Sequence, residues 1–203
     1  MHNAVAGMFI EMIVKFTESK ILPYDLKELI DNTIFDYLPR IHAHLARAEA
    51  NGNLTDFLEP GQKQFQLLEK TVQVRDNLQK EKITLFQELS EIVHKRNVTK
   101  LTELPFEARI DENNRLIEFE KCFINPHGVP GNPQARHLLF HPSADDWYNG
   151  DAISQVHDMI SRIETSLNEQ KLNHYSKRLA KEIALVNVAF ICAKHSLSDF
   201  FTL

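Results

Sequence analysis

The fold is decided by residues 174–197, HYSKRLAKEIALVNVAFICAKHSL. Apolar residues recur in this segment at intervals of three and four, which is typical of one face of a helix: Leu179, Ile183, Val186, Phe190 and Ala193. From Ile183 onward the segment is apolar nearly all round, and a helix of that kind is buried on more than one side. We expect it either to lie at the centre of a helical bundle or to contact another subunit as well.

Five other segments show the periodicity of a helix, with approximate bounds 3–19, 25–50, 62–95, 111–123 and 152–167. Asp25 and Glu28 form a capping box that starts the second of these helices, and Asp111 can cap the fourth. Pro39 lies inside the second helix, where we expect a kink or a break, because proline has no backbone N–H to donate. Residues 1–203 are therefore predicted to form one all-α domain, a helical bundle.

The composition changes between residues 125 and 150, which hold four of the eight prolines and three of the six glycines. Such a segment cannot form a long helix. We expect an irregular loop over residues 124–151, in which residues 137–140 can pair as one short strand. Loops of this length are usually functional or disordered, so this loop is the first place to search for a site.

The net charge and the hydropathy exclude two classes of partner. The chain has 23 basic and 28 acidic residues, a net charge of −5, and the basic residues are scattered. Nucleic acids and anionic membranes attract clustered positive charge, so neither is an expected partner. The longest apolar run, residues 183–193, is shorter than the roughly 20 residues that span a bilayer, so we expect a soluble chain without direct membrane insertion. The first helix begins almost at residue 1, which suggests a domain cut from a longer protein.

The cysteines and the sequons bear on the cellular compartment. Two cysteines, Cys122 and Cys192, are too few for a disulfide framework. Both have apolar neighbours in the sequence, so we expect buried free thiols. Asn53 and Asn97 each begin an Asn-X-Thr glycosylation sequon, which permits an extracellular location without indicating one.

The sequence contains no recognisable set of residues for catalysis or for metal binding. Ten histidines are present, but His42 and His44 point to different sides of a helix, and His137 and His141 lie in the proline-rich loop. No HExxH, CxxC pair, GxSxG or glycine-rich phosphate loop occurs. We predict no catalytic residue and no metal ligand in this chain.

Two groups of residues distinguish the end of the loop. Asp145, Asp146 and Asp151 are interpreted as a solvated acidic segment in which Asp151 caps the following helix. Trp147, the one tryptophan of the chain, stands next to Tyr148. This aromatic pair either anchors the loop by burial or contacts a ligand or a partner.

Four segments of the chain resemble a known family. They are ILPYD (21–25), EFEKCFINPHGVP (118–130), RHLLFHPS (136–143) and WYNGD (147–151). Their order and spacing are similar to those of segments in the glutamate carboxypeptidase II relatives, whose C-terminal helical domain is shared with the transferrin receptor. The resemblance extends over nearly the whole chain and is weakest over residues 81–109.

The resemblance implies a fold, a partner and a location. In this family the helical domain builds the homodimer, and the full proteins are type II membrane proteins. An upstream protease-like domain holds two zinc ions, and all the zinc ligands lie upstream of the segment resembled here. We therefore expect a homodimer that holds no cofactor itself, is no enzyme on its own and contacts an upstream protease-like domain. The parent would place it on the extracellular side of a membrane.

The resemblance also implies substrate-binding residues. In the family's peptidases that remove C-terminal glutamate, a Lys-Tyr pair holds the carboxylates of the substrate. Tyr148 is retained here, whereas Trp147 stands at the lysine position and carries no charge. A preference for glutamate is therefore not expected. In a full-length parent we expect Tyr148, Trp147, His137 and Arg136 to contribute to the pocket, the last two by bracing the loop or by facing the substrate.

Two functions remain open at this point. The first is a homodimerisation domain of a glutamate carboxypeptidase-like protein, whose loop adds to the substrate pocket of a neighbouring zinc peptidase domain. The alternative is a non-catalytic, receptor-like binding module that resembles the transferrin receptor. The presence or loss of the zinc ligands in an upstream domain would distinguish them.

Overall fold

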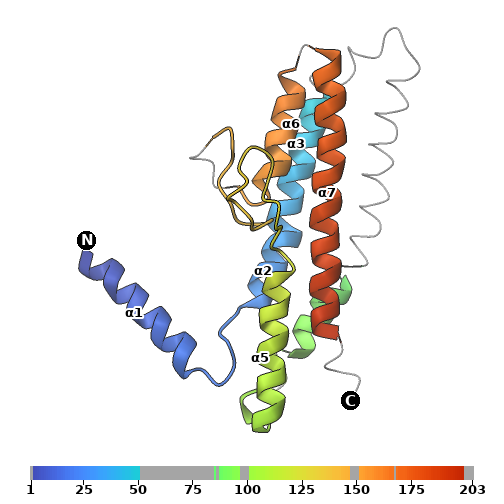
Figure 1. The fold of residues 1–203 in the computed structure, drawn as a ribbon. Coiled ribbons are helices and arrows are strands. Elements are labelled where there is room, and N and C mark those ends of the chain that lie inside the picture. The colour runs from blue at the N-terminus through green and yellow to red at the C-terminus, as the bar shows by residue number, and fades with distance from the viewer. Residues whose placement is uncertain are drawn as a thin grey trace.

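A computed structural model of the chain describes residues 2–50, 85, 87–96, 101–146, 151–166 and 168–198. Figure 1 shows three helices side by side in the upper half of the bundle and a fourth that continues it beside the C-terminal end of the longest helix. The three are α3 (Leu38–Ala50), α6 (Ser154–Glu164) and α7 (Glu169–Ser198), and the fourth is α5 (Phe106–Lys121). The described residues form no strand, and the prediction of an all-α helical bundle is confirmed.

The longest helix, α7, supplies one wall of the core. Leu179, Val186, Phe190 and Ala193 are buried as the periodicity predicts, and Ile183 is half-buried. The ring of Phe190 packs edge-on against Phe123 at the end of α5, with 5.1 Å between the ring centroids. The helix α6 packs on both α3 and α7, and the core also includes residues of α2 (Leu26–Asn32), of the segment 87–96, of α5 and of the loop 124–151. Two further apolar residues of α7 stay exposed, Val188 at 61% and Ile191 at 38%. The expected burial in the bundle is thus confirmed for one side of the helix, and contact with another subunit stays a prediction.

The first helix, α1 (His2–Glu18), stands away from the bundle (Figure 1). Every residue from Val5 to Glu18 is exposed, and Met8 is exposed by 72%. At its C-terminal end the ring of Phe16 meets that of Tyr24, with 5.9 Å between centroids. The helix thus leaves a large apolar surface uncovered by the rest of the described chain.

The second predicted helix consists of three joined elements. Asp25 caps α2 (Leu26–Asn32) by accepting a hydrogen bond from the backbone N–H of Glu28 at 2.9 Å. A π-helical turn, η1 (Thr33–Tyr37), then leads into α3 without a break. Pro39 is the second residue of α3, and the wider turn before it accommodates the missing N–H that was expected to kink or break the helix.

The helix α5 begins five residues earlier than the sequence suggests. A short 3₁₀ turn, η3 (Leu101–Glu103), precedes it, and Pro105 occupies its N-cap position with φ −54°. Asp111, the expected cap, therefore lies inside the helix. Most of the predicted helix 62–95 lies outside the described residues. In this region residues 85 and 87–96 are described, and they are helical. This segment packs against α5 through a buried ion pair between Arg96 and Glu112.

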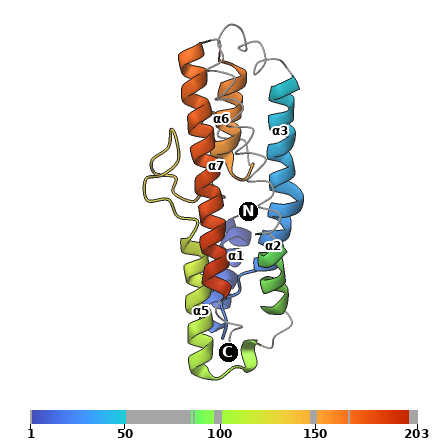
Figure 2. The same ribbon diagram turned by 90° about the vertical axis from the view of Figure 1, so that its right-hand side faces the viewer.

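The expectation of two free thiols is wrong, because Cys122 and Cys192 form a disulfide with 5.7 Å between their Cα atoms. Cys122 is the C-cap of α5, and Cys192 lies on the exposed side of α7. Arg115 of α5 also reaches the carbonyl of Ser196 on α7, so the two helices run antiparallel. Figure 2 shows α5 and the lower end of α7 adjacent from a second direction. The pairing depends on how α5 and α7 are aligned against each other, and the sequence around each cysteine does not predict that alignment.

Candidate functional site

The loop 124–151 begins on a fully buried ring at the end of α5. Phe123 packs between Phe119 and Phe190, with ring centroids 5.4 and 5.1 Å away. Its carbonyl accepts a hydrogen bond from the N–H of Leu138 at 2.8 Å, and the carbonyl of Arg136 accepts one from Asn125 at 2.8 Å. These two bonds close the neck of the loop. The predicted short strand at 137–140 is absent, and only an isolated bridge between Ile124 and His137 forms there.

The far part of the loop requires its glycines. Gly128 has φ +69° and Gly131 has φ +83°, values that L side chains rarely adopt. A Cβ atom on Gly128 would lie 2.4 Å from the carbonyl oxygen of Pro133, whereas one on Gly131 would meet the Cβ of Ala144 at 3.1 Å. The side chain of Asn125 closes the first turn by donating to the carbonyl of Gly128 at 2.7 Å.

His137 braces the neck of the loop from inside. Its Nδ1 accepts hydrogen bonds from the backbone N–H groups of Leu139 and Phe140, each at 3.1 Å. Its Nε2 must then carry the ring proton, and it donates to the carboxylate of Glu120 at 3.1 Å. This hydrogen bond lowers the pKa of Glu120 below its ordinary value, against the opposing effect of burial. The imidazole also stacks on Phe123. One ring nitrogen of His137 is thus used within the loop and the other ties the loop to α5.

The other three predicted site residues have different positions. The side chain of Arg136 is exposed, while its backbone carbonyl contributes to the neck. Trp147 and Tyr148 lie outside the described residues. The structure therefore brings His137 and Arg136 together as chain neighbours at the base of the loop, with one side chain turned inward and the other turned outward.

The segment before Trp147 is anchored on α6 by two side chains. The buried carboxylate of Asp158 accepts hydrogen bonds from the Ser143 hydroxyl at 2.6 Å and from the Ala144 N–H at 2.9 Å. Arg162, one turn further along α6, makes a bidentate pair with Asp145, with both N–O distances 2.7 Å. The hydrogen bond from Arg162 lowers the pKa of Asp145. Asp145 is exposed, as expected for a solvated acidic segment, but it is also paired with Arg162.

The segment after Gly150 is anchored as well. The carboxylate of Asp151 accepts a hydrogen bond from Arg40 of α3 at 3.0 Å, so it does not act as the expected side-chain cap. The N-cap of α6 is instead Ile153, a left-handed residue with φ +59°. A β-branched residue in that conformation is a strained outlier, and here its side chain is only 1% exposed. Its N–H donates to the carbonyl of Leu139 at 2.8 Å.

A polar hollow of about 420 Å³ lies between these two anchors. Side chains of both charge signs line it, from α3, from α6 and from the loop: Arg40, His44, Arg47, Asp145, Asp146, Asp151, His157 and Asp158. The hollow offers hydrogen bonds to a polar group, and Arg40 and Arg162 already neutralise two of its carboxylates. Sequence reasoning missed His44, His157, Asp158 and Arg162, because their partners are more than ten residues away in the chain.

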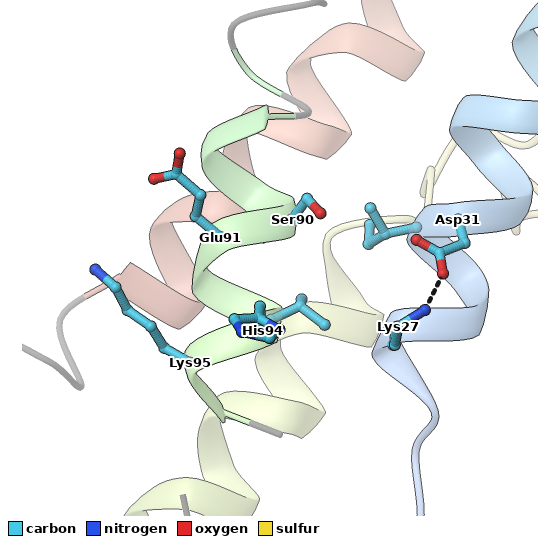
Figure 3. Close-up of a pocket in the computed structure, with 8 residues that line it drawn as sticks. Lys27, Asp31, Ser90, Glu91, His94 and Lys95 are labelled. Carbon is cyan, nitrogen blue, oxygen red and sulfur yellow. Dashed lines mark hydrogen bonds and ion pairs between the residues drawn. The ribbon is translucent and has the colours of Figure 1, made fainter. Parts of the chain in front are cut away.

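A second hollow, of about 450 Å³, lies between α2 and residues 87–96 (Figure 3). Lys27 and Asp31 pair with each other on the α2 side. On the other side Glu91 and Lys95 point away from α2. The charged groups of this hollow do not converge on one point. It is therefore a weaker candidate for a binding site than the loop 124–151.

The described residues also bear on metal binding and on membrane insertion. Within these ranges no group of three or more His, Cys, Asp or Glu side chains is arranged to hold a metal ion. None of the described helices is long and apolar enough to cross a bilayer. The described part of the chain is thus a helical bundle that presents a loop anchored on both sides of residues 147–150.

Comparison with known proteins identifies the family. The family model of the transferrin receptor-like dimerisation domain matches residues 58–198. The chain is 30% identical over 201 residues to a glutamate carboxypeptidase 2 homolog of Caenorhabditis briggsae, a match that covers 98% of this chain and 24% of the relative. A second glutamate carboxypeptidase 2 homolog, from Caenorhabditis elegans, is 26% identical with the same coverage.

The chain belongs to the transferrin receptor-like dimerisation domain family. It is a dimerisation domain with glutamate carboxypeptidase homologues, as the sequence resemblance implied. The chain spans about a quarter of the length of these curated relatives. The helices α1, α2 and α3 precede the match to the family model, although both relatives align with nearly the whole chain.

Proposed function

We propose that this chain forms a two-fold homodimer through exposed apolar residues of α7 and α5. We propose further that its loop 124–151 adds to the substrate pocket of a zinc peptidase domain in a longer parent protein. In this proposal the zinc ions are held by the parent's upstream domain and the present chain supplies none of their ligands. The anchoring of the loop on both sides of residues 147–150 is the observation that carries the second part.

The apolar surface favours a second copy of the chain as the partner of α7. Val188 and Ile191 are exposed, and they belong to the region matched by a dimerisation family. On α5, Phe106, Ile110 and Ile117 follow a spacing of four and seven residues, so they share one exposed face. Exposed apolar surface of this kind marks interaction sites, and a two-fold interface uses the same surface on both subunits.

The dimer is tested on the chain itself. Light scattering should give twice the chain mass of 23.5 kDa. The double substitution Val188→Glu and Ile191→Glu should give a monomer with an unchanged helical circular dichroism spectrum, because it buries two charges in the interface. Lys177→Glu, on an exposed part of the same helix, should leave the mass unchanged. A wild-type monomer at tens of micromolar would contradict this half of the proposal.

The anchors support a substrate-holding role for Tyr148 and Trp147. Asp158 and Arg162 hold the segment before them, and Arg40 and the strained Ile153 hold the segment after them. Such bracing supports a functional group, because a site needs its loop fixed before the ligand arrives. Tyr148 can donate a hydrogen bond, and Trp147 offers apolar area without charge. We expect a preference for apolar over acidic C-terminal residues.

The pocket is tested in a parent that carries the upstream domain. Peptides ending in leucine should be cleaved better than peptides ending in glutamate, and Trp147→Lys should raise activity on glutamate. Tyr148→Phe should lower kcat/KM by the loss of one hydrogen bond, about tenfold. If Tyr148→Phe leaves kcat/KM unchanged, the proposed contact between Tyr148 and the substrate is wrong and the loop has only a structural role. A parent without zinc and without hydrolysis would favour the receptor-like binding module.

A further inference from the structure

Two histidines from different helices lie in direct contact at the floor of the polar hollow. His44 of α3 and His157 of α6 have their Nδ1 atoms 3.0 Å apart. The rings are nearly parallel, with 19° between their planes and 5.3 Å between centroids. His157 is 7% exposed, and the side chain of His44 is 12% exposed. The pair is one of the polar contacts that join α3 to α6.

The geometry permits only one proton between these nitrogens. A neutral imidazole has one N–H donor and one acceptor nitrogen, whereas a protonated imidazole has two donors. In the observed contact one Nδ1 donates and the other accepts. When both rings are protonated, two N–H groups face each other and two positive charges meet in a half-buried site, so the contact is lost.

Charged groups from all three neighbouring elements face the pair. Asp158 on α6 and Asp151 in the loop favour protonation of His157, while Arg40 and His44 on α3 oppose it. Burial has the largest effect, and together these groups lower the pKa of His157 below its ordinary value. On the other side of the pair the Nε2 atom of His44 lies 3.4 Å from a carboxylate oxygen of Glu164.

Arg47, Asp145 and Asp146 complete the charged lining of the hollow. None of these three contributes to the shift of His157, and Asp145 is engaged by Arg162. The titration of His157 is therefore governed by burial and by the groups closest to it.

The pair lies between the two anchors of the loop. Arg40 stands one helical turn before His44 on α3 and binds Asp151. Asp158 directly follows His157 on α6 and binds Ser143 and Ala144. A separation of α3 from α6 at the histidines would therefore move the groups that hold both ends of the segment 143–151.

We propose that His44 and His157 form an acid-sensitive clamp, closed by one shared proton near neutral pH and opened when both rings are protonated. Opening loosens α3 from α6 and weakens the anchors of the loop at Asp151 and Ser143. This inference does not depend on dimerisation or on a substrate, because it concerns a contact within one chain.

The sign of the pH dependence follows from linkage. His157 takes up its proton at about pH 6.5 in the unfolded chain, and at a lower pH in the folded chain. The unfolded state therefore binds more protons in the interval between the two values. The contribution to stability is complete above about pH 6.5 and is lost as the pH falls through the lowered pKa of the folded state. Across that interval the folding equilibrium constant falls by up to about tenfold per pH unit.

Nuclear magnetic resonance tests the shared proton directly in the wild-type chain. At about pH 7.5 a scalar coupling across the hydrogen bond should connect the Nδ1 nuclei of His44 and His157. As the pH is lowered through the folded-state pKa of His157 the coupling should vanish, and the protection of the amides of Ala144 and Ile153 against hydrogen exchange, corrected for the intrinsic pH dependence of exchange, should fall more than that of amides in α5. A coupling that is absent at the higher pH, or that persists unchanged at the lower pH, would overturn the proposal.

Urea unfolding of matched variants tests the thermodynamics. His157→Asn keeps an amide near the Nδ1 position but cannot titrate, so it should remove most of the tenfold-per-unit dependence. His44→Asn should reduce the dependence only in part, because burial, the largest cause of the lowered pKa of His157, remains. His174→Asn, an exposed histidine on α7, should retain it. A variant that does not fold leaves the wild-type coupling to decide the question. The same pH dependence in His157→Asn, His44→Asn and the wild type would refute the clamp.

Discussion

The disulfide between Cys122 and Cys192 should be a major source of the stability of this chain. It closes a loop of 70 residues. A cross-link of that span removes conformational entropy from the unfolded state, which corresponds to about 4 kcal/mol at room temperature. The native state should change little when the bond is removed, because Cys192 is exposed and Cys122 is half-buried, so serine at both positions leaves no large cavity.

The assay is urea unfolding followed by far-ultraviolet circular dichroism. The double variant Cys122→Ser and Cys192→Ser should unfold with a free energy about 4 kcal/mol below that of the oxidised wild type. With a denaturant dependence of about 2 kcal/mol per molar, the midpoint should fall by about 2 M urea. Its helical spectrum in the absence of urea should match that of the wild type.

Two controls make this prediction decisive. A thiol reagent should find no free thiol in the untreated wild type and two after reduction. Reduction should shift the wild type to the midpoint of the double variant and leave the double variant unchanged. The reasoning fails if the oxidised wild type and the double variant share one midpoint. It also fails if two free thiols react in the folded, untreated chain.

Three further substitutions probe the loop and the core. Gly128→Ala should destabilise the chain by about 1–3 kcal/mol in thermal unfolding, and by more than Gly131→Ala, because its Cβ meets a backbone oxygen and not a side-chain methyl. Glu112→Gln should cost about 3–5 kcal/mol in urea unfolding, because it removes the negative charge of a buried ion pair with Arg96. Glu118→Gln on the exposed face of α5 is the matched control. Arg162→Gln should raise the pKa of Asp145 towards its ordinary value, measured by carboxyl chemical shifts, since the hydrogen bond from Arg162 is the main cause of its lowering.

The fold class could be predicted because the helices of the bundle bury regular apolar stripes, although α1, which carries such a stripe too, leaves it exposed. The apolar stripe of α7 can be recognised from the sequence of this helix alone, and the residues that are buried follow its spacing. Element bounds were less predictable. Pro105 made the preceding segment look irregular, yet α5 begins directly after it, because the dihedral angle of proline suits the start of a helix. Pro39 likewise looked like a helix breaker, but the π-helical turn before it accommodates the missing N–H and the helix continues.

The irregular loop could be predicted from the sequence, but the contacts that anchor it could not. The proline and glycine content marks the loop, and the positive φ angles of Gly128 and Gly131 explain part of that composition. The anchors could not be foreseen, because Asp158 and Arg162 read as ordinary polar positions of α6, and only tertiary contact brings them to Ser143 and Asp145. The contact between His44 and His157 could not be foreseen either, because the two residues are 113 positions apart in the sequence.

One covalent bond connects the two surfaces to which function is assigned. Cys122 directly precedes Phe123, whose carbonyl closes the neck of the loop, and Cys192 follows Ile191 on the exposed face of α7. The disulfide therefore fixes the first residues of loop 124–151 to the helix proposed to form the dimer contact. Among the described residues, the other end of the loop is held by hydrogen bonds and ion pairs to α3 and α6 and by the buried side chain of Ile153. Acid acts on that second end through the histidines, whereas reduction acts on the first end, so the two ends of the loop respond to different chemical conditions.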